Sequence, residues 1–230
     1  PDWNNYEPIK PNSLGISIFD NIDISKVLHY IDWTPFFSTW QLRGKYPKIF
    51  HNTTIGAEAK KLYEDAQSML DLIVKDKWIT LRGVIGLFPA NADGEDVVIY
   101  DPKNPAEELG RIYNLREQKK KAQGRPNLSL TDYVIPTEMG KQDYMGAFAV
   151  TAGIGIEKHI EKFKANHDDY SEIMLKALAD RLAEAMAEYM HKKVRQEHWG
   201  YERGENLSNE DLKAEKYVGI RPAPGYPACP

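Results

Sequence analysis

The nine residues from Arg221 to Cys229, RPAPGYPAC, constrain the fold more than any other stretch of this 230-residue chain. Proline fixes its own φ, lacks a backbone N–H donor and pushes the preceding residue toward extended geometry. Pro222, Pro224 and Pro227 each impose these restrictions, so the segment cannot be regular helix or sheet. Gly225 alone in the segment is free to turn. The segment is therefore either a proline-rich tail leaving a domain or a rigid platform that presents its side chains.

Two side chains of this segment carry recognition chemistry. Arg221 presents a planar guanidinium whose paired N–H groups match a carboxylate, and Tyr226 lies close by in the chain. Cys229 is the one cysteine of the sequence, which excludes an internal disulfide framework and a cysteine-based zinc site. We interpret it as a small side chain near a terminus, and its isolation fits a reducing cytoplasm.

Composition places the chain among ordinary globular proteins and excludes several classes of partner. Hydrophobic residues make up 42% and charged residues 28%, and 230 residues suffice for one large domain with a sizeable core. The formal net charge of -4 provides no basic field for nucleic acid or an anionic membrane. No apolar run approaches the ~20 residues of a membrane span, and no signal peptide is visible.

Hydrophobic periodicity predicts two long helices, over 56–77 and 170–199, and shorter ones over 25–31 and 156–165. A last short helix is expected to begin near Ser208, whose spacing to Asp211 resembles a capping box. The helix over 25–31 is expected to stop before the Thr34-Pro35 pair. The buried stripe of the 170–199 helix is expected to comprise Leu178, Leu182, Ala185, Met186 and Tyr189.

Strands are expected in the middle of the chain. Residues 82–90 and 96–101 flank the turn-forming NADGE as in a hairpin, 111–115 adds a third strand, and 143–153 suits a central strand passing close beneath another element. No regular structure is expected over 1–15, and 117–127 reads as a solvated, lysine-rich loop or a frayed helix. Helices, then sequential strands, then helices favour an α+β fold with a mainly antiparallel sheet.

Two acidic features are candidates for binding. Asp32 lies in IDWTPFF among apolar and aromatic residues, where a carboxylate is costly to desolvate unless it is paired. It could equally cap a short helix that starts near Trp33. Asp180, Glu184 and Glu188 recur every four residues and line one helix face, which is either solvated or directed at a cation.

Motifs of self-contained enzymes are missing from the sequence. Six histidines are scattered without HExxH or similar spacing, so no protein-bound metal is expected. Neither GxSxG nor GxGxxG occurs, and GIGIE at 153–157 holds only two of the required glycines. We therefore assign no catalytic residue, and a hydrolase or a Rossmann methyltransferase is disfavoured.

Five blocks resemble, in order, the activation domain of cobalamin-dependent methionine synthases, and together they cover essentially the whole chain. They are IDWTPFFSTWQLRGKYPKIF at 31–50, RGVIGLFPAN at 82–91, DYMGAFAVTAG at 143–153, HDDYSEIMLKALADRLAEAMAEYMHKKVR at 167–195 and RPAPGYPACP at 221–230. In that family the chain continues beyond the final block and supplies further ligand contacts. We therefore expect residues 1–230 to be a single activation domain from a larger multidomain enzyme, truncated at its C-terminal end.

The resemblance implies a site for S-adenosylmethionine, a sulfonium cation joined to an amino acid and a nucleoside. Arg221 would bind its carboxylate and Asp32 its ammonium group, with acidic residues facing the sulfonium or a partner module. The positions that match the family's ligand contacts or adjoin them are Asp32, Asp180, Glu184, Arg221, Ala223, Gly225 and Tyr226.

The resemblance also implies the chemistry and the partners. The domain would hold the methyl donor over a cobalamin carried by another module of the same polypeptide, and any zinc would lie elsewhere in the full-length enzyme. One electron from a flavodoxin-type protein would convert cob(II)alamin to cob(I)alamin, which takes the methyl group. The cobalt is the nucleophile, so the domain supplies positioning and electrostatics and would not turn over alone.

Two other functions remain open at this point. A non-catalytic module would sense S-adenosylmethionine, or only dock the cobalamin domain, without supporting methyl transfer. A free-standing small-molecule methyltransferase would act without a partner, and it is the weaker alternative because the sequence shows a binding constellation and no catalytic triad.

Overall fold

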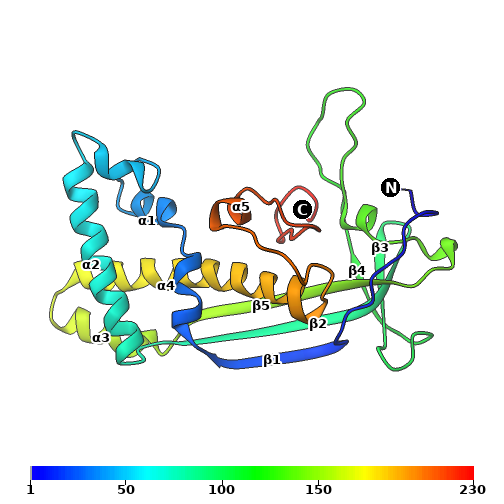
Figure 1. The fold of residues 1–230 in the computed structure, drawn as a ribbon, viewed down its shortest axis with the longest axis horizontal. Coiled ribbons are helices and arrows are strands. Elements are labelled where there is room, and N and C mark those ends of the chain that lie inside the picture. Colours follow the sequence, from blue (N-terminus) through cyan, green and yellow to red (C-terminus); the bar gives the residue numbers. More distant parts are fainter. Residues whose placement is uncertain (1) are drawn as a thin grey trace. The chain divides into compact units, whose positions relative to one another are not determined.

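The computed structural model describes residues 2–230, drawn with their helices and strands in Figure 1. The chain divides into two compact units. Unit 1 comprises the chain up to Ser17, Ile85–Phe148 and His191–Pro230, and unit 2 comprises Ile18–Val84 and Ala149–Met190. Three strands and the longest helix run through both units, so each unit is built from segments far apart in the sequence.

Five strands form one sheet with the order β1-β2-β3-β4, and β5 also pairs with β2. The strands are β1 Gly15–Ile22, β2 Thr80–Asp93, β3 Asp96–Tyr100, β4 Glu108–Tyr113 and β5 Asp143–Ile154. The β2–β3 and β3–β4 pairs are antiparallel. The predicted α+β class, with an antiparallel sheet flanked by helices, is confirmed.

The predicted hairpin is present in unit 1, with a tighter turn than the sequence indicated. Strand β2 continues to Asp93, so only Gly94 and Glu95 connect it to β3, and Gly94 has a φ of 62° that favours glycine. Asp93 pairs directly with Asp96, an arrangement of like charges that is unfavourable by itself. Arg111 of β4 offsets it by donating to Asp93 at 2.7 Å.

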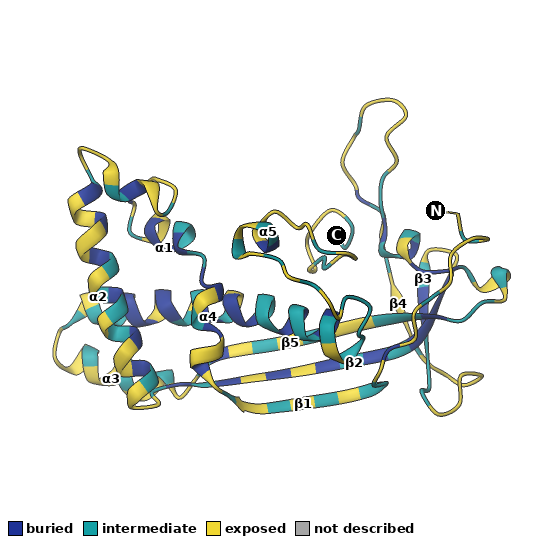
Figure 2. Cartoon of the chain, in the orientation of Figure 1, coloured by how far each residue is buried: buried dark blue, intermediate teal, exposed yellow. Residues whose placement is uncertain are grey.

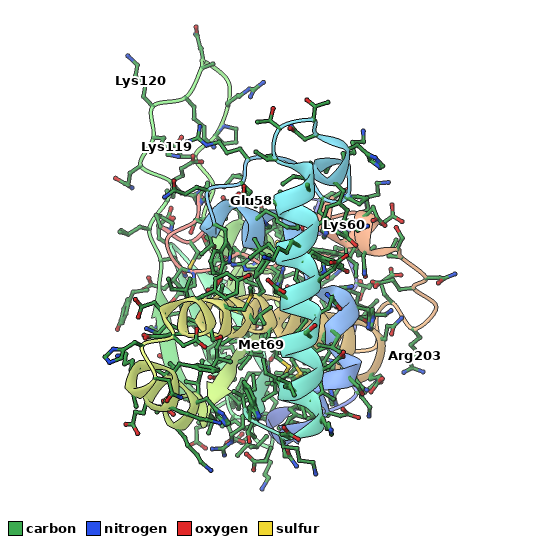
Figure 3. The ribbon with its side chains drawn as sticks, turned by 90° about the vertical axis from the view of Figure 1, so that its left-hand side faces the viewer. Glu58, Lys60, Met69, Lys119, Lys120 and Arg203 are labelled. Atoms are coloured by element: carbon green, nitrogen blue, oxygen red, sulfur yellow. The ribbon has the colours of Figure 1, made fainter. Side chains whose placement is uncertain are left out.

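Buried alanines and valines form the core beneath this hairpin. Ala90, Ala92, Val97 and Val134 pack together, with Ile99 and Met145 against them. The loop after β4 extends away from the strands and carries Lys119 and Lys120 (Figure 3). Of the two alternatives for 117–127, a loop and a frayed helix, the structure shows the loop.

The α-helices are α1 Trp33–Thr39, α2 Gly56–Lys75, α3 Ile156–Ala165, α4 Asp169–Lys193 and α5 Asn209–Lys213. A π-helical turn, Val194–His198, continues α4, and 3₁₀ turns occupy Ile24–Lys26, Leu28–Tyr30, Lys48–His51, Leu130–Tyr133 and Thr137–Met139. Figure 2 shows the amphipathic character of α2, whose Leu62 and Ile73 are buried, while Glu58 and Lys60, labelled in Figure 3, are exposed. The long helices were therefore predicted to within a few residues of their ends.

Aromatic rings make up much of the core around α1 in unit 2. Trp33 contacts Phe36 edge to face at 5.3 Å between ring centroids, and Trp33 contacts Tyr63 of α2 at 4.8 Å. Gly56 begins α2 where a Cβ would lie 2.5 Å from the Phe50 carbonyl oxygen, so this approach of two backbones requires glycine. Helix α1 is thereby held against α2 by packing.

Three expectations about local structure were wrong. The helix over 25–31 is two 3₁₀ turns, although it does end before the Thr34-Pro35 pair as expected. That pair lies in α1, the short helix starting at Trp33 that the sequence left open, and its first turn needs no N–H from Pro35. Strand β1 was not predicted; its alternation of Ile16, Ser17 and Ile18 is short, and both isoleucines are exposed in the structure. Strand β5 pairs with β2 alone among the strands of residues 2–230, so it lies at an edge rather than centrally.

The close approach expected along β5 is nevertheless present. A Cβ on Gly146 would lie 2.7 Å from Leu87 Cδ2 and 3.5 Å from the Trp199 ring, so a larger residue would displace β2 side chains. Over residues 2–230, no helix combines the length and apolar character that crossing a membrane requires.

Candidate ligand-binding site

The terminal signature folds as a tight, hydrogen-bonded loop in unit 1. The N–H of Tyr226 donates to the Ala223 carbonyl at 3.1 Å, and Gly225 and Cys229 are joined through the Gly225 N–H and the Cys229 carbonyl at 2.7 Å. Gly225 has a φ of 90° with open space around it, so its backbone angle rather than crowding selects glycine. The loop is thus preorganised, and it leaves the Tyr226 ring 64% exposed.

The segment that leads into this loop is anchored on unit 1. Gly219 has a φ of 92° and lies against Tyr201, whose hydroxyl would be 2.9 Å from a Cβ at that position. Two residues later, Arg221 is half-buried, and its charge contributes to lowering the pKa of His191. Arg221 is therefore close enough to the end of α4 to act on it electrostatically.

A fully buried arginine lies at the end of α4. Arg195 has 0% exposure, and its Nε and Nη2 donate to the two carboxylate oxygens of Glu205 at 2.5 and 2.6 Å. Its Nη1 lies 2.7 Å from His191 Nδ1, and its guanidinium lies 4.6 Å from the centroid of the Tyr217 ring. This bidentate, stacked arrangement satisfies a charge that could not otherwise be buried.

The π-helical turn places this arginine and connects it to the N-terminal arm. The N–H of Trp199 donates to the Val194 carbonyl at 2.8 Å, a spacing of five residues, and π-turns inside helices are frequent at functional sites. The arm packs against the same turn, because Trp199 Nε1 donates to the Ile9 carbonyl at 2.6 Å and Asn12 donates to the Trp199 carbonyl at 3.2 Å. Residues 2–14 carry no helix or strand, as expected.

The neutral form of His191 follows from its partners. Arginine has no acceptor, so Nδ1 of His191 accepts the hydrogen bond from Arg195 and the imidazole proton resides on Nε2. Burial lowers the pKa of His191 to about 3, with further lowering by the charges of Arg195 and Arg221. A protonated His191 would remove the acceptor and place a third cation in this cluster.

In unit 2, Asp32 is the N-cap of α1. Its Oδ1 accepts from the Thr34 backbone N–H at 3.3 Å, and its backbone is extended, with φ -86° and ψ 111°. The structure therefore shows the capping role that the sequence left open. The carboxylate is half-buried beside Trp33 and Phe36, both of which are buried.

The segment that carries Asp32 packs on α4. Tyr30, two residues earlier, contacts Tyr189 of α4 at 6.1 Å between ring centroids. Farther back along α4, Asp180 and Glu184 are exposed, while Leu178 and Leu182 are fully buried on another face. Asp180 accepts from Arg181, so one of the two exposed charges already has a cation. Glu188, the third residue of this face, is half-buried, so the acidic face is solvated only in part.

The predicted ligand residues fall into both units. Arg221, Ala223, Gly225 and Tyr226 lie in the anchored terminal segment of unit 1, and Asp32, Asp180 and Glu184 lie in unit 2. A cavity of about 250 Å³ in unit 1 is lined by Trp3, Arg116 and Glu138 among others, and by none of the predicted ligand residues. Among residues 2–230, no group of three or more His, Cys, Asp or Glu side chains could hold a metal ion.

The sequence did not reveal the network of His191, Arg195, Glu205 and Tyr217. Steps of four residues along the buried stripe of α4 lead from Met186 to Met190 and then to Val194, which are both buried. His191 follows Met190 directly in the sequence, and Arg195 follows Val194. That extension could have suggested a buried arginine, but not its partners, since Glu205 and Tyr217 follow in irregular segments.

Comparison with known proteins decides the family. A family model for the activation domain of vitamin B12-dependent methionine synthase matches residues 23–230. The chain belongs to this family. It is also similar to a structure described as the MetH reactivation domain bound to AdoHcy, at 50% sequence identity and a TM-score of 0.94. That similarity covers 100% of this chain and 70% of the other.

The neutral state of His191 predicts how stability of this activation domain depends on pH. The folded-state pKa of about 3 lies below the ordinary value of 6.5, so the unfolded chain binds this proton first. His191 therefore stabilises the fold fully above pH 6.5, and this contribution is lost as the pH falls toward 3. Relative to His191→Asn, the wild type should lose about 1 kcal/mol of unfolding free energy between pH 7.5 and about 5.5.

Urea unfolding of both proteins at the two pH values measures this difference. The Asn side chain keeps an acceptor for Arg195 but has no titration of its own. An equal pH dependence in the two proteins would show that His191 is protonated normally in the folded state.

Proposed function

We propose that this chain binds S-adenosylmethionine and presents its methyl group for reductive reactivation of the cobalamin of a methionine synthase. The observation that carries the proposal is the preorganised terminal loop, which follows directly on a half-buried arginine. The similar MetH reactivation domain, related over this entire chain, was determined with AdoHcy, the demethylated form of the same ligand. A loop already folded before binding lowers the ordering cost of ligand capture.

The charged ends of the ligand match two of the predicted residues. The guanidinium of Arg221 would bind the carboxylate with paired N–H donors, and Asp32 would accept from the ammonium group. The cap role of Asp32 is compatible with this, because a carboxylate can accept several hydrogen bonds at once.

The terminal loop would serve the nucleoside and the sulfonium. Within the loop, Ala223 is exposed and would offer its backbone, and Gly225 lets a ligand approach without a side chain. The exposed ring of Tyr226 would pack against the ligand, since an aromatic face attracts a cation. Each contact fits a residue type that the loop already holds in place.

The exposed acidic residues of α4 would act through their negative charge rather than through hydrogen bonds to the ligand. We propose that Asp180 and Glu184 face the sulfonium or the module that carries cobalamin, in a single activation domain of a larger polypeptide. Cobalamin, when bound by its own module, supplies the nucleophile that accepts the methyl group. Electrons would come from a flavodoxin-type protein in the cytoplasm, and this chain's residues would hold and orient the donor without turning over alone.

Replacing Arg221 tests ligand binding directly. Arg221→Ala should weaken S-adenosylmethionine binding by about 2 to 4 kcal/mol, the usual loss when one partner of a desolvated charge-assisted pair is removed. Isothermal titration calorimetry of the wild type and the variant measures the change. Lys216→Ala, which removes an exposed lysine five residues earlier, is the matched control and should bind normally. An unchanged dissociation constant for Arg221→Ala would reject the assignment of this residue.

Asparagine at position 32 separates the cap from the ligand contact. An amide caps a helix about as well as a carboxylate, so Asp32→Asn should keep the unfolding free energy within about 0.5 kcal/mol. It cannot neutralise an ammonium group, so affinity for S-adenosylmethionine should fall at least about tenfold.

Calorimetry and thermal unfolding of the same preparation give both quantities. Normal binding by Asp32→Asn, with earlier melting of Asp32→Ala, would make Asp32 a structural cap only. A chain that binds the donor but does not support methyl transfer to chemically reduced cobalamin in the intact enzyme would instead be a sensor or docking module.

A further inference from the structure

The end of α4 contains an ion pair that stability alone does not explain. Arg195 is 0% exposed and the side chain of Glu205 is 4% exposed, so both charges have lost their hydration. Replacing such a pair by well-packed apolar residues is often neutral or stabilising. A role in placing other residues accounts better for a buried, bidentate pair at this position.

We infer that His191, Arg195, Glu205 and Tyr217 form a positioning network that holds Arg221 for recognition of the ligand's carboxylate. The inference rests on the proposed function, because it concerns the same ligand. The network itself would not contact the ligand. By positioning Arg221, it would favour ligands that carry a free carboxylate.

The contacts that hold the chain just before Arg221 are the first observation in favour of this inference. The Tyr217 ring lies against the Arg195 guanidinium at 4.6 Å and edge to face against the His191 ring at 4.7 Å, four residues before Arg221. Gly219, between them, adopts a left-handed φ of 92° against Tyr201. The chain from Tyr217 to Arg221 is therefore fixed at two points, which leaves Arg221 little freedom of direction.

The segment before Tyr217 is fixed by the same ion pair. Gln196 donates to the Glu205 carbonyl at 2.8 Å, and the Glu202 N–H donates to the Arg195 carbonyl at 3.0 Å. Both sides of Glu205, its carboxylate and its backbone, are thus tied to the π-helical turn. Loss of the pair would remove the side-chain tie between this stretch and the turn and leave these two backbone contacts in place, which loosens the position of Tyr217.

The second support is electrostatic. The charges of both Arg195 and Arg221 act on His191, so the two cations lie in one neighbourhood. Glu205 neutralises Arg195 through two hydrogen bonds, and neutral His191 adds no charge. Arg195 therefore already has its counter-ion within the cluster, and we assign the contact with an incoming carboxylate to Arg221.

The test compares two ligands that differ only in the carboxylate, S-adenosylmethionine and decarboxylated S-adenosylmethionine. The double variant Arg195→Met/Glu205→Leu removes both charges and keeps apolar volume, so it is expected to fold. By calorimetry, its affinity for S-adenosylmethionine should fall about tenfold or more, while its affinity for the decarboxylated ligand stays within about twofold of wild type. The control Lys216→Met, in the same segment, should preserve both affinities.

The conservative variant Arg195→Lys covers the case in which the double variant does not fold. Lysine keeps the charge but lacks the planar fork, so the ratio of the two affinities should fall to between the wild-type value and that of Arg221→Ala. Combining Arg195→Lys with Arg221→Ala should add no further loss for S-adenosylmethionine, since both act through one contact.

The outcomes are distinguishable. Unchanged affinity for both ligands in the folded network variants would overturn the inference and leave the proposed function standing. Equal loss for both ligands would also overturn it, because the network would then support the pocket as a whole rather than the carboxylate contact. Failure of the wild-type chain to bind S-adenosylmethionine would reject the proposed function and the inference together.

Discussion

The path of the chain between α4 and Arg221 depends on one buried charge, the guanidinium of Arg195. A cation with 0% exposure is costly to bury without acceptors, and Glu205 and His191 accept from its Nε, Nη1 and Nη2 while the Tyr217 ring lies against the guanidinium. Because these partners come from α4 and from the irregular segment after it, satisfying the arginine also fixes the path of the chain toward Arg221. The terminal loop then begins from an anchored position.

Much of the fold could be predicted because its long elements follow strong local rules. The apolar spacing of α2 and α4 and the Gly94 turn between β2 and β3 are set by residues close together in the sequence. Strand β1 could not be found by a search for buried faces, since Ile16 and Ile18 point to solvent and its place depends on pairing with β2. Helix α1 was left open by the sequence as a short helix capped by Asp32, and Pro35 is compatible with it because proline is tolerated in a first turn.

The candidate site was predictable where the chain itself restricts conformation. Three prolines and Gly225 make the terminal loop recognisable, and the structure gives Gly225 the left-handed φ that the sequence allowed. Asp32 was not predictable in this way, because a carboxylate at that position suits either a paired, partly buried site or a helix cap. The structure shows the cap. The Arg195 network could not be predicted from the sequence, because nothing in the residues around a charged side chain indicates that distant partners will bury it.

The most direct test of the account is a crystal structure of this chain grown with S-adenosylhomocysteine, the ligand class seen in the similar MetH reactivation domain. We expect the ligand's carboxylate at hydrogen-bond distance, about 2.7–3.2 Å, from the Arg221 guanidinium, and its amino group beside Asp32. The network around Arg195 should be unchanged by binding. A ligand bound away from the terminal loop, or with its carboxylate directed elsewhere than Arg221, would contradict the account.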